Sequence, residues 1–180
     1  MGEPAHDAAW RAARHTVWNC MLDAARVTMY AEMRGKHYRV LHGTVRTVLL
    51  LSATASATAV LDTALGDASL GNVWRLVPNV LIAATVVIDY VADFGTKIAA
   101  LNLAKRTSQR LVEKDWRRLW DDIDGGAATV EEIQSRNDAL LHQLHEATGP
   151  MDEHVTVNDK ANVLSTERAY KVMVAQYAAQ

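Results

Sequence analysis

The sequence predicts an all-α fold. Gly and Pro are scarce, with 9 and 3 copies among 180 residues, and the plentiful Ala, Leu, Arg and Glu favour helices. Runs of β-branched residues are too short to form a sheet, whereas apolar residues recur at the three- and four-residue steps of amphipathic helices. We expect a long amphipathic helix, a two-helix apolar hairpin, a second long helix and two shorter C-terminal helices.

The length of the chain suits one structural domain. We divide it into an N-terminal helix over residues 1–46, a hairpin over 47–92 and a C-terminal helical region over 93–180. The net charge of −2 and the pI of about 6.4 provide no basic surface for phosphates, so no nucleic-acid partner is expected. The single cysteine, Cys20, cannot form an internal disulfide, which suits a mainly cytosolic protein.

The apolar residues of the N-terminal helix form a continuous seam. They recur at alternating three- and four-residue steps: Trp10, Ala13, Val17, Cys20, Ala24, Val27 and Ala31. Such a seam packs against another helix or against a second copy of the chain. Gly35 is expected to interrupt this helix before the apolar hairpin begins.

The hairpin is nearly stripped of positive charge. Of the 19 Lys and Arg residues, seven lie in 1–46 and eleven in 93–180, which leaves only Arg75 in between. The uncharged stretches Thr47–Leu61 and Leu76–Ile88 are shorter than the roughly 20 residues of a transmembrane helix. Extended to Gly43–Leu65 and Val73–Asp93, with "GDASLGN" as the turn, they predict a two-helix transmembrane hairpin.

The charges that flank this hairpin predict its orientation. Basic residues precede the first span and follow the second: Arg34, Lys36, Arg39 and Arg46, then Lys97, Lys105, Arg106 and Arg110. Cytoplasmic segments of membrane proteins carry such an excess of Lys and Arg. We expect a membrane protein, with the lipid bilayer as a partner and both termini in the cytoplasm.

Charged residues at the two ends of the hairpin suggest how its helices pair. If Asp62 lies opposite Arg75 at the outer end, Arg46 approaches Asp89 and Asp93 at the cytoplasmic end. The two acids are four residues apart and share a helix face. They form either a helix-end ion pair with Arg46 or an acidic ring at a pore mouth.

Small polar residues inside the spans also allow two interpretations. Ser52, Ser56 and Thr58 lie in the first span, and Asn79 lies in the second. They can pack the two helices closely, because small residues let helix backbones approach one another. Alternatively, they line a polar passage through the membrane.

The C-terminal region is expected to begin with a long helix that ends at "DGG", residues 124–126. Its apolar face is Leu101, Ala104, Ser108, Val112, Trp116, Leu119 and Ile123. Thr129 and Glu132 predict a capping box for the next helix, which "TGP" at 148–150 is expected to close. A last helix is expected from about Asn162 to Gln176.

No sequence motif predicts catalysis. The chain lacks a Gly-x-Ser-x-Gly elbow, a GxGxxG turn and a phosphate-binding loop. His142 and His145 in "HQLHE" lie three residues apart, but no further metal-binding motif completes a site, so we interpret them as part of a solvated helix end. We expect neither an enzyme nor a cofactor.

With a helix, two short spans, the segment "KRTSQRLVEKDWRRLW" and a helical tail, the chain resembles the SLATT family over roughly residues 10 to 177. These two-transmembrane effectors accompany SMODS nucleotidyltransferases and SLOG domains in bacterial conflict systems. The resemblance implies an anti-phage effector of abortive infection, a homo-oligomer whose hairpins open a pore and depolarise the inner membrane. It also implies a trigger in trans, either a sensor protein or a nucleotide signal.

Two other functions remain open on the sequence alone. The chain can be a soluble all-α interaction or scaffold protein in which residues 47–61 and 76–88 are buried core helices. It can also be a phage-exclusion protein that spans the membrane without conducting ions. These alternatives differ in where the apolar stretches lie and in whether the membrane loses its potential.

Overall fold

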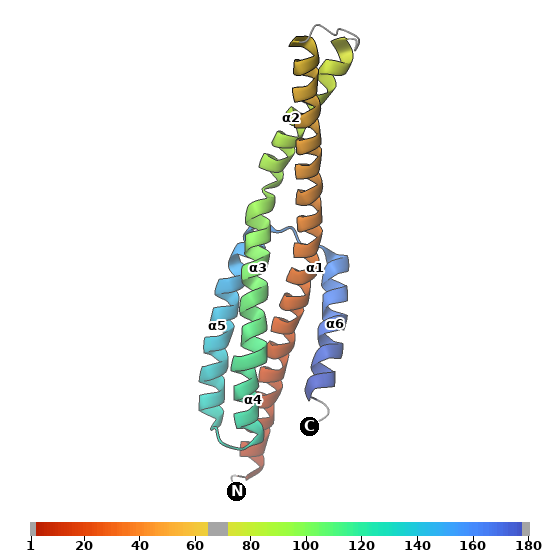
Figure 1. Ribbon diagram of the computed structural model, residues 1–180. Coiled ribbons are helices and arrows are strands. Elements are labelled where there is room, and N and C mark those ends of the chain that lie inside the picture. The colour runs from red at the N-terminus through yellow and green to blue at the C-terminus, as the bar shows by residue number, and fades with distance from the viewer. Residues whose placement is uncertain (1–2, 65–71, 178–180) are drawn as a thin grey trace. The chain divides into compact units, whose positions relative to one another are not determined.

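The computed structural model describes residues 3–64 and 72–177, and every element in these ranges is helical (Figure 1). The side chains of residues 3–7, 59, 61–64 and 72–76 are outside the description. The elements are α1 (Glu3–Ala64), α2 (Asn72–Ala92), α3 (Phe94–Arg110), the π-helix η1 (Leu111–Trp116), α4 (Arg117–Asp124), α5 (Val130–His154) and α6 (Asp159–Tyr177). The expected all-α class is confirmed.

The chain divides into two compact units. Unit 1 comprises residues 1–35 and 99–180, and unit 2 comprises residues 36–98. The charge pattern had placed its boundaries after residues 46 and 92, whereas the units meet after residues 35 and 98. Each unit is described below by itself.

The expected interruption of the first helix at Gly35 is wrong, because α1 continues through this residue. Gly35 is buried, and a Cβ atom there would lie 3.9 Å from Cβ of Leu101 on α3. A single glycine costs a helix only about 1 kcal/mol relative to alanine. That distance is an ordinary van der Waals contact, so the packing of α1 against α3 does not require the absence of a side chain, and Gly35 does not end the helix.

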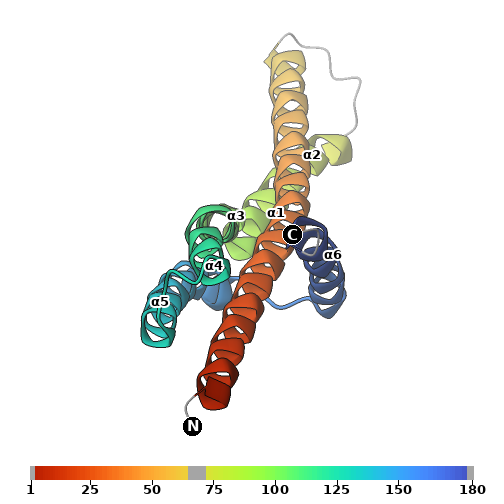
Figure 2. The ribbon, with the colours of Figure 1, turned by 90° about the horizontal axis from the view of Figure 1, so that it is seen from below.

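The hydrophobic core lies in unit 1. There α1 lies between α6 on one side and the α3–α4 and α5 helices on the other, as the two views in Figures 1 and 2 agree. The α1 seam contributes buried Ala13, Val17, Ala24 and Ala31. This seam therefore packs against helices of its own chain.

The apolar face expected for the long third helix is confirmed, since all seven of its residues are buried. The π-helix within it was not expected. Trp116 is completely buried at the end of η1, and its indole nitrogen donates a hydrogen bond of 2.9 Å to Oδ1 of Asn137 on α5. The π-helix thus ends at the residue whose indole ring contacts α5.

The signals around the α4–α5 turn are confirmed in part. Helix α4 ends at Asp124, and Gly126 follows with a φ of +63°, a left-handed conformation that favours glycine. Thr129 and Glu132 form the predicted capping box. The expected end of α5 at 148–150 is wrong, because α5 includes Pro150 and continues to His154. A proline removes one backbone hydrogen bond, and the helix continues for only one further turn.

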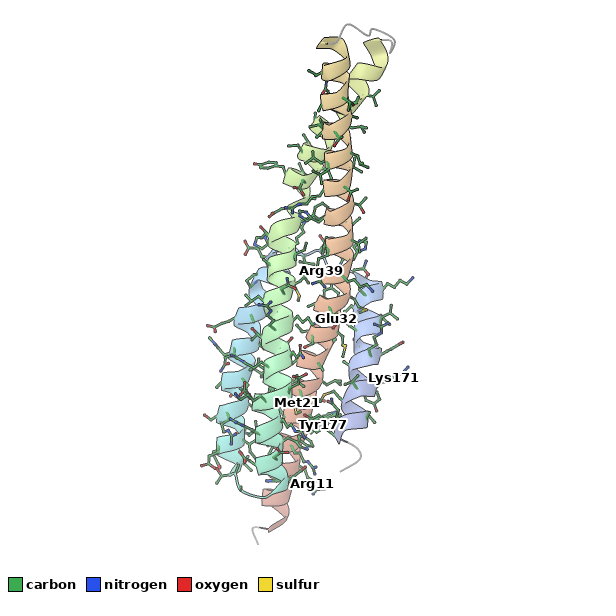
Figure 3. All side chains as sticks on the ribbon, in the orientation of Figure 1. Arg11, Met21, Glu32, Arg39, Lys171 and Tyr177 are labelled. Atoms are coloured by element: carbon green, nitrogen blue, oxygen red, sulfur yellow. The ribbon has the colours of Figure 1, made fainter. Side chains whose placement is uncertain are left out.

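Aromatic and charged contacts join the helix ends of unit 1. The ring of Tyr177 lies 6.1 Å from that of Trp18 and 6.2 Å from that of Trp120, so α6 contacts both α1 and α4. In Figure 3, Tyr177 lies on the side of α6 that faces α1, whereas Lys171 points away. Arg14 lies 4.8 Å above the Trp120 ring and forms an ion pair of 2.7 Å with Asp124.

The buried Trp116–Asn137 hydrogen bond generates a stability prediction. Replacing Asn137 by Ala leaves the buried indole N–H unpaired, which destabilises the fold by about 1–3 kcal/mol. The matched control is Asp138→Ala, which removes an exposed side chain from the same helix and changes stability by less than about 0.5 kcal/mol. Chemical denaturation of the full chain, followed by tryptophan fluorescence, measures both. If the two variants unfold at the same denaturant concentration, this role of Asn137 is contradicted.

Tyr177 generates a pH prediction. Burial is the largest effect and raises the pKa of Tyr177, although Arg117 opposes it. The neutral phenol is therefore favoured in the folded state, so its contribution to stability is present below the pKa of an unfolded tyrosine and is lost as the pH rises through the folded value. In an ultraviolet titration of the full chain, Tyr177→Phe should remove a phenol that ionises at a higher pH than a free tyrosine does. Removal of a phenol that ionises at the pH of a free tyrosine contradicts the docking of α6.

Candidate membrane-spanning hairpin

Unit 2 contains the apolar stretches of the chain. Among the described residues, one helical run, Val77–Asp124, contains a segment that is long and apolar enough to cross a membrane, and 11% of that segment is buried. Its apolar part coincides with the second predicted span, Val73–Asp93. The first predicted span, Gly43–Leu65, extends beyond the described residues.

Two polar contacts join α1 and α2. The Ser56 hydroxyl donates a hydrogen bond of 3.0 Å to Oδ1 of Asn79, and Nδ1 of His42 lies 3.1 Å from Oδ1 of Asp89. The helices run antiparallel, since the earlier residue of α1 contacts the later residue of α2 (Figure 1). If Asp62 lies opposite Arg75, Asn79 is expected opposite Thr58, whereas its observed hydrogen-bond partner is Ser56, two residues earlier on α1.

Polar side chains lie between the two helices, and large apolar side chains lie outside. Within residues 47–61 and 76–88, the only buried side chains that the structure describes are those of Ser52 and Thr85, each 6% exposed. By contrast, Leu51 is 68% and Val87 59% exposed. Other large apolar side chains are exposed in the same way: Val48, Leu50, Val60, Val77, Val80, Leu81, Val86 and Ile88.

The described residues of these stretches do not form a buried core within the chain. A helix in the core of a soluble protein buries its aliphatic residues. Here most of the described large aliphatic residues are exposed, and small hydroxyl residues occupy the helix contact.

Most threonines of unit 2 satisfy their own hydroxyls. Thr47, Thr54 and Thr85 each donate to the backbone carbonyl four residues earlier, and Thr58 donates to the carbonyls of Ala55 and Thr54. Such bonds leave no hydroxyl proton unpaired in an apolar solvent. The polarity of this stretch is thus compatible with lipid.

The predicted pairing at the cytoplasmic end is only partly observed. Among the described residues, the hydrogen-bond partner of Asp89 is His42 rather than Arg46. Arg46 instead lines the same groove as Asp89. Asp93 lies beyond the end of α2 with a φ of +43°, so the four-residue spacing no longer places both carboxylates on one helix face.

A lysine side chain binds a backbone carbonyl group at the junction between α2 and α3. Nζ of Lys97 donates a hydrogen bond of 2.6 Å to the carbonyl oxygen of Ala92, the last residue of α2. The same ammonium lies 5.9 Å from the ring centre of Tyr38, whose ring lies 6.3 Å from that of Phe94. His42 packs against Phe94 at 5.8 Å. Aromatic rings and charges therefore surround this end of the hairpin.

Sequence reasoning missed three of these residues. His42 and Lys97 were treated only as flanking residues, and Thr85 was not singled out. The signal for His42 was its position: it precedes the apolar stretch by about one helical turn, at the depth of Asp89 in an antiparallel pair. Asp62 and Arg75, the predicted outer pair, fall on side chains outside the described residues.

A groove of about 240 Å³ opens between α1 and α2 near this end. It is lined by Val45, Arg46, Leu49, Thr85, Val86, Asp89 and Tyr90. Tyr90 is 86% exposed. A cation and a carboxylate thus lie at the polar end of an otherwise apolar groove.

Unit 1 carries the remaining candidate ligands. Nδ1 of His142 lies 3.5 Å from Oε1 of Glu146 on the exposed side of α5. Both residues lie within α5 and not at the helix end that the sequence predicted, because α5 continues to His154. In the part of the chain that the structure describes, no three His, Cys, Asp or Glu residues converge as a metal site requires. Burial raises the pKa of the Cys20 thiol, although a hydrogen bond from Asn137 opposes this shift, so Cys20 is a weak nucleophile at neutral pH.

Comparison with known proteins adds no relative. No family model, no curated protein and no solved structure matches this chain.

The Ser56–Asn79 contact generates a prediction for the register. In a Cys20→Ala background, oxidation in membranes should join the pair Ser56→Cys and Asn79→Cys faster than the matched pair Thr58→Cys and Asn79→Cys. The reason is that disulfides form only between closely apposed Cβ atoms. Peptide mass spectrometry distinguishes the bond within one chain from a bond between copies. If the Thr58→Cys and Asn79→Cys pair forms its disulfide faster, the pairing of Thr58 with Asn79 that the sequence predicts is supported instead.

Proposed function

We propose that the protein is a homo-oligomeric two-span membrane effector of a bacterial anti-phage system. The first span is Gly43–Leu65 and the second Val73–Asp93. When a partner sensor or a nucleotide signal triggers the protein, its hairpins open a pore that depolarises the inner membrane. The trigger acts in trans on the cytoplasmic helices.

One observation carries the membrane part of this proposal: the buried side chains of the two apolar stretches are the hydroxyl residues Ser52 and Thr85, whereas most of the large aliphatic residues there are exposed. In water this arrangement forgoes hydrophobic stabilisation of about 25 cal/mol for each Å² of exposed apolar surface. In lipid it is favourable, because polar groups need partners and aliphatic groups do not. The exposed apolar residues of both helices therefore fit the hydrocarbon core of a bilayer.

The charge distribution supports the orientation of the hairpin. His42, Arg46 and Asp89 lie at the end where α1 enters unit 2 and α2 leaves it, and Lys97 follows. An excess of Lys and Arg flanks this end in the sequence, as on the cytoplasmic side of inner-membrane proteins. This distribution supports a topology with both termini in the cytoplasm.

The pore part of the proposal depends on association between copies. Within one chain, Ser52 is buried and Ser56 is hydrogen-bonded to Asn79, whereas Thr58 and Asn79 remain exposed. Thr58 and Asn79 are therefore the side chains through which an oligomer of hairpins can line a passage. The SLATT resemblance supports this arrangement. A phage-exclusion protein that spans the membrane without conducting is the alternative that the depolarisation experiment distinguishes.

Fractionation and a potential-sensitive dye test the proposal in cells. The protein should remain in the membrane pellet after alkaline carbonate extraction, and the dye should report depolarisation when phage infection triggers the native system. Replacing Thr58, an exposed residue of the proposed passage, by Leu should preserve insertion and abolish depolarisation. The matched control, Ala53→Leu with Ala57→Leu, adds aliphatic bulk on the adjacent exposed face and should preserve both.

Two outcomes contradict different parts of the proposal. Recovery of the wild-type protein in the carbonate supernatant contradicts membrane insertion. Inserted protein that protects the cells while they remain polarised contradicts the pore and favours the non-conducting alternative.

A further inference from the structure

We propose that the groove lined by Arg46, Leu49, Thr85, Val86, Asp89 and Tyr90 binds a phospholipid with a phosphoethanolamine headgroup. This inference rests on the membrane insertion proposed above and goes beyond it, because it names a lipid class and the residues that select it. Neither pore formation nor a trigger enters the argument.

The groove is charged at one end and aliphatic at the other, as a phospholipid is. Because α1 runs toward the hairpin connection and α2 runs away from it, Leu49 and Val86 lie closer to the connection than Arg46 and Asp89 do. The charged end therefore lies at headgroup depth and the aliphatic end at acyl-chain depth. Thr85 leaves no hydroxyl proton unpaired at acyl-chain depth, because its hydroxyl donates a hydrogen bond of 2.6 Å to the carbonyl oxygen of Leu81.

The two charges of the groove match the two charges of the headgroup. The guanidinium of Arg46 can donate paired hydrogen bonds to a phosphate. Asp89 uses Oδ1 for His42 and is 43% exposed, so its carboxylate can accept further hydrogen bonds from the groove side. Tyr90, 86% exposed, supplies an aromatic ring and a hydroxyl at headgroup depth.

The carboxylate determines which headgroup fits. A primary ammonium offers three N–H donors to Asp89, whereas a trimethylammonium offers none and is bulkier. The anionic headgroup of phosphatidylglycerol offers hydroxyl donors but no positive charge that offsets the carboxylate, and like charges in such proximity repel. Phosphatidylethanolamine is therefore favoured over both phosphatidylcholine and phosphatidylglycerol.

Competition between lipids tests this selectivity. The full-length protein is reconstituted in vesicles with equal amounts of phosphatidylethanolamine, its N-methyl and N,N-dimethyl derivatives, and phosphatidylcholine, all with the same acyl chains. Native mass spectrometry then measures the lipid that remains bound. Retention should fall with each methyl group, by about tenfold across the series, because about 1.4 kcal/mol of charge-assisted hydrogen bonding corresponds to tenfold in affinity.

Variants assign the selectivity to this groove. Asp89→Asn keeps a carbonyl acceptor for His42 but removes the charge, so the preference across the series should disappear. Arg46→Gln should reduce retention of all four lipids. Arg39→Gln removes an exposed cation of the same helix outside the groove and should change neither result.

The outcomes separate this inference from the proposed function. Equal retention of the four lipids by carbonate-resistant wild-type protein, or an unchanged preference in Asp89→Asn, overturns the lipid site and leaves insertion and pore formation standing. Extraction of the wild-type protein by carbonate overturns insertion and the lipid site together. If cells with the wild-type protein stay polarised during phage infection and the protein keeps its lipid preference, only the pore is overturned.

Discussion

The pairing of small polar groups between α1 and α2 is the constraint on which unit 2 depends. Ser56 and Asn79 satisfy each other, and buried Ser52 and Thr85 occupy the same helix contact because large side chains would hold the backbones apart. With the small residues turned inward, the aliphatic residues have only the outer surface to occupy. The exposure of most leucines and valines in this unit is therefore a consequence of this pairing.

Unit 1 follows the opposite rule with the same first helix. There Ala13, Val17 and Ala24 of α1 turn inward against Trp116 and Leu119, and charged residues such as Arg14 and Asp124 stay at the surface. Polar groups in its core are paired, as burial requires: Trp116 with Asn137, and Ser108 with Thr28. A single helix thus carries an apolar inner seam before Gly35 and an apolar outer surface after residue 47. The burial pattern of the apolar side chains therefore changes along α1, although its backbone is continuous.

The elements that depend on local chemistry could be predicted from the sequence. The capping box at Thr129, the stop at residues 124–126 and the buried face from Leu101 to Ile123 all follow from residue type and spacing. The continuity of α1 and α5 could not, because Gly35 and Pro150 weaken a helix by amounts that packing offsets. The π-helix left an unused signal: Ala104, Ser108, Val112 and Trp116 are four residues apart, and such steps drift around a helix of 3.6 residues per turn. A wider turn cancels that drift and keeps Trp116 in the core.

The cytoplasmic end of the hairpin shows why the site was harder to predict than the fold. Spacing alone placed Asp89 and Asp93 on one face, but this argument holds only while the helix is regular. The left-handed conformation at Asp93 ends α2, and Lys97 binds the freed carbonyl of Ala92. Asp93 is thereby removed from the helix contact, and Asp89 remains as the one carboxylate of the groove, held by His42. Arg46 is then opposed by one carboxylate instead of two, so the groove carries balanced charges. That balance, produced by a backbone irregularity, is what suits it to a zwitterionic headgroup rather than to a cation.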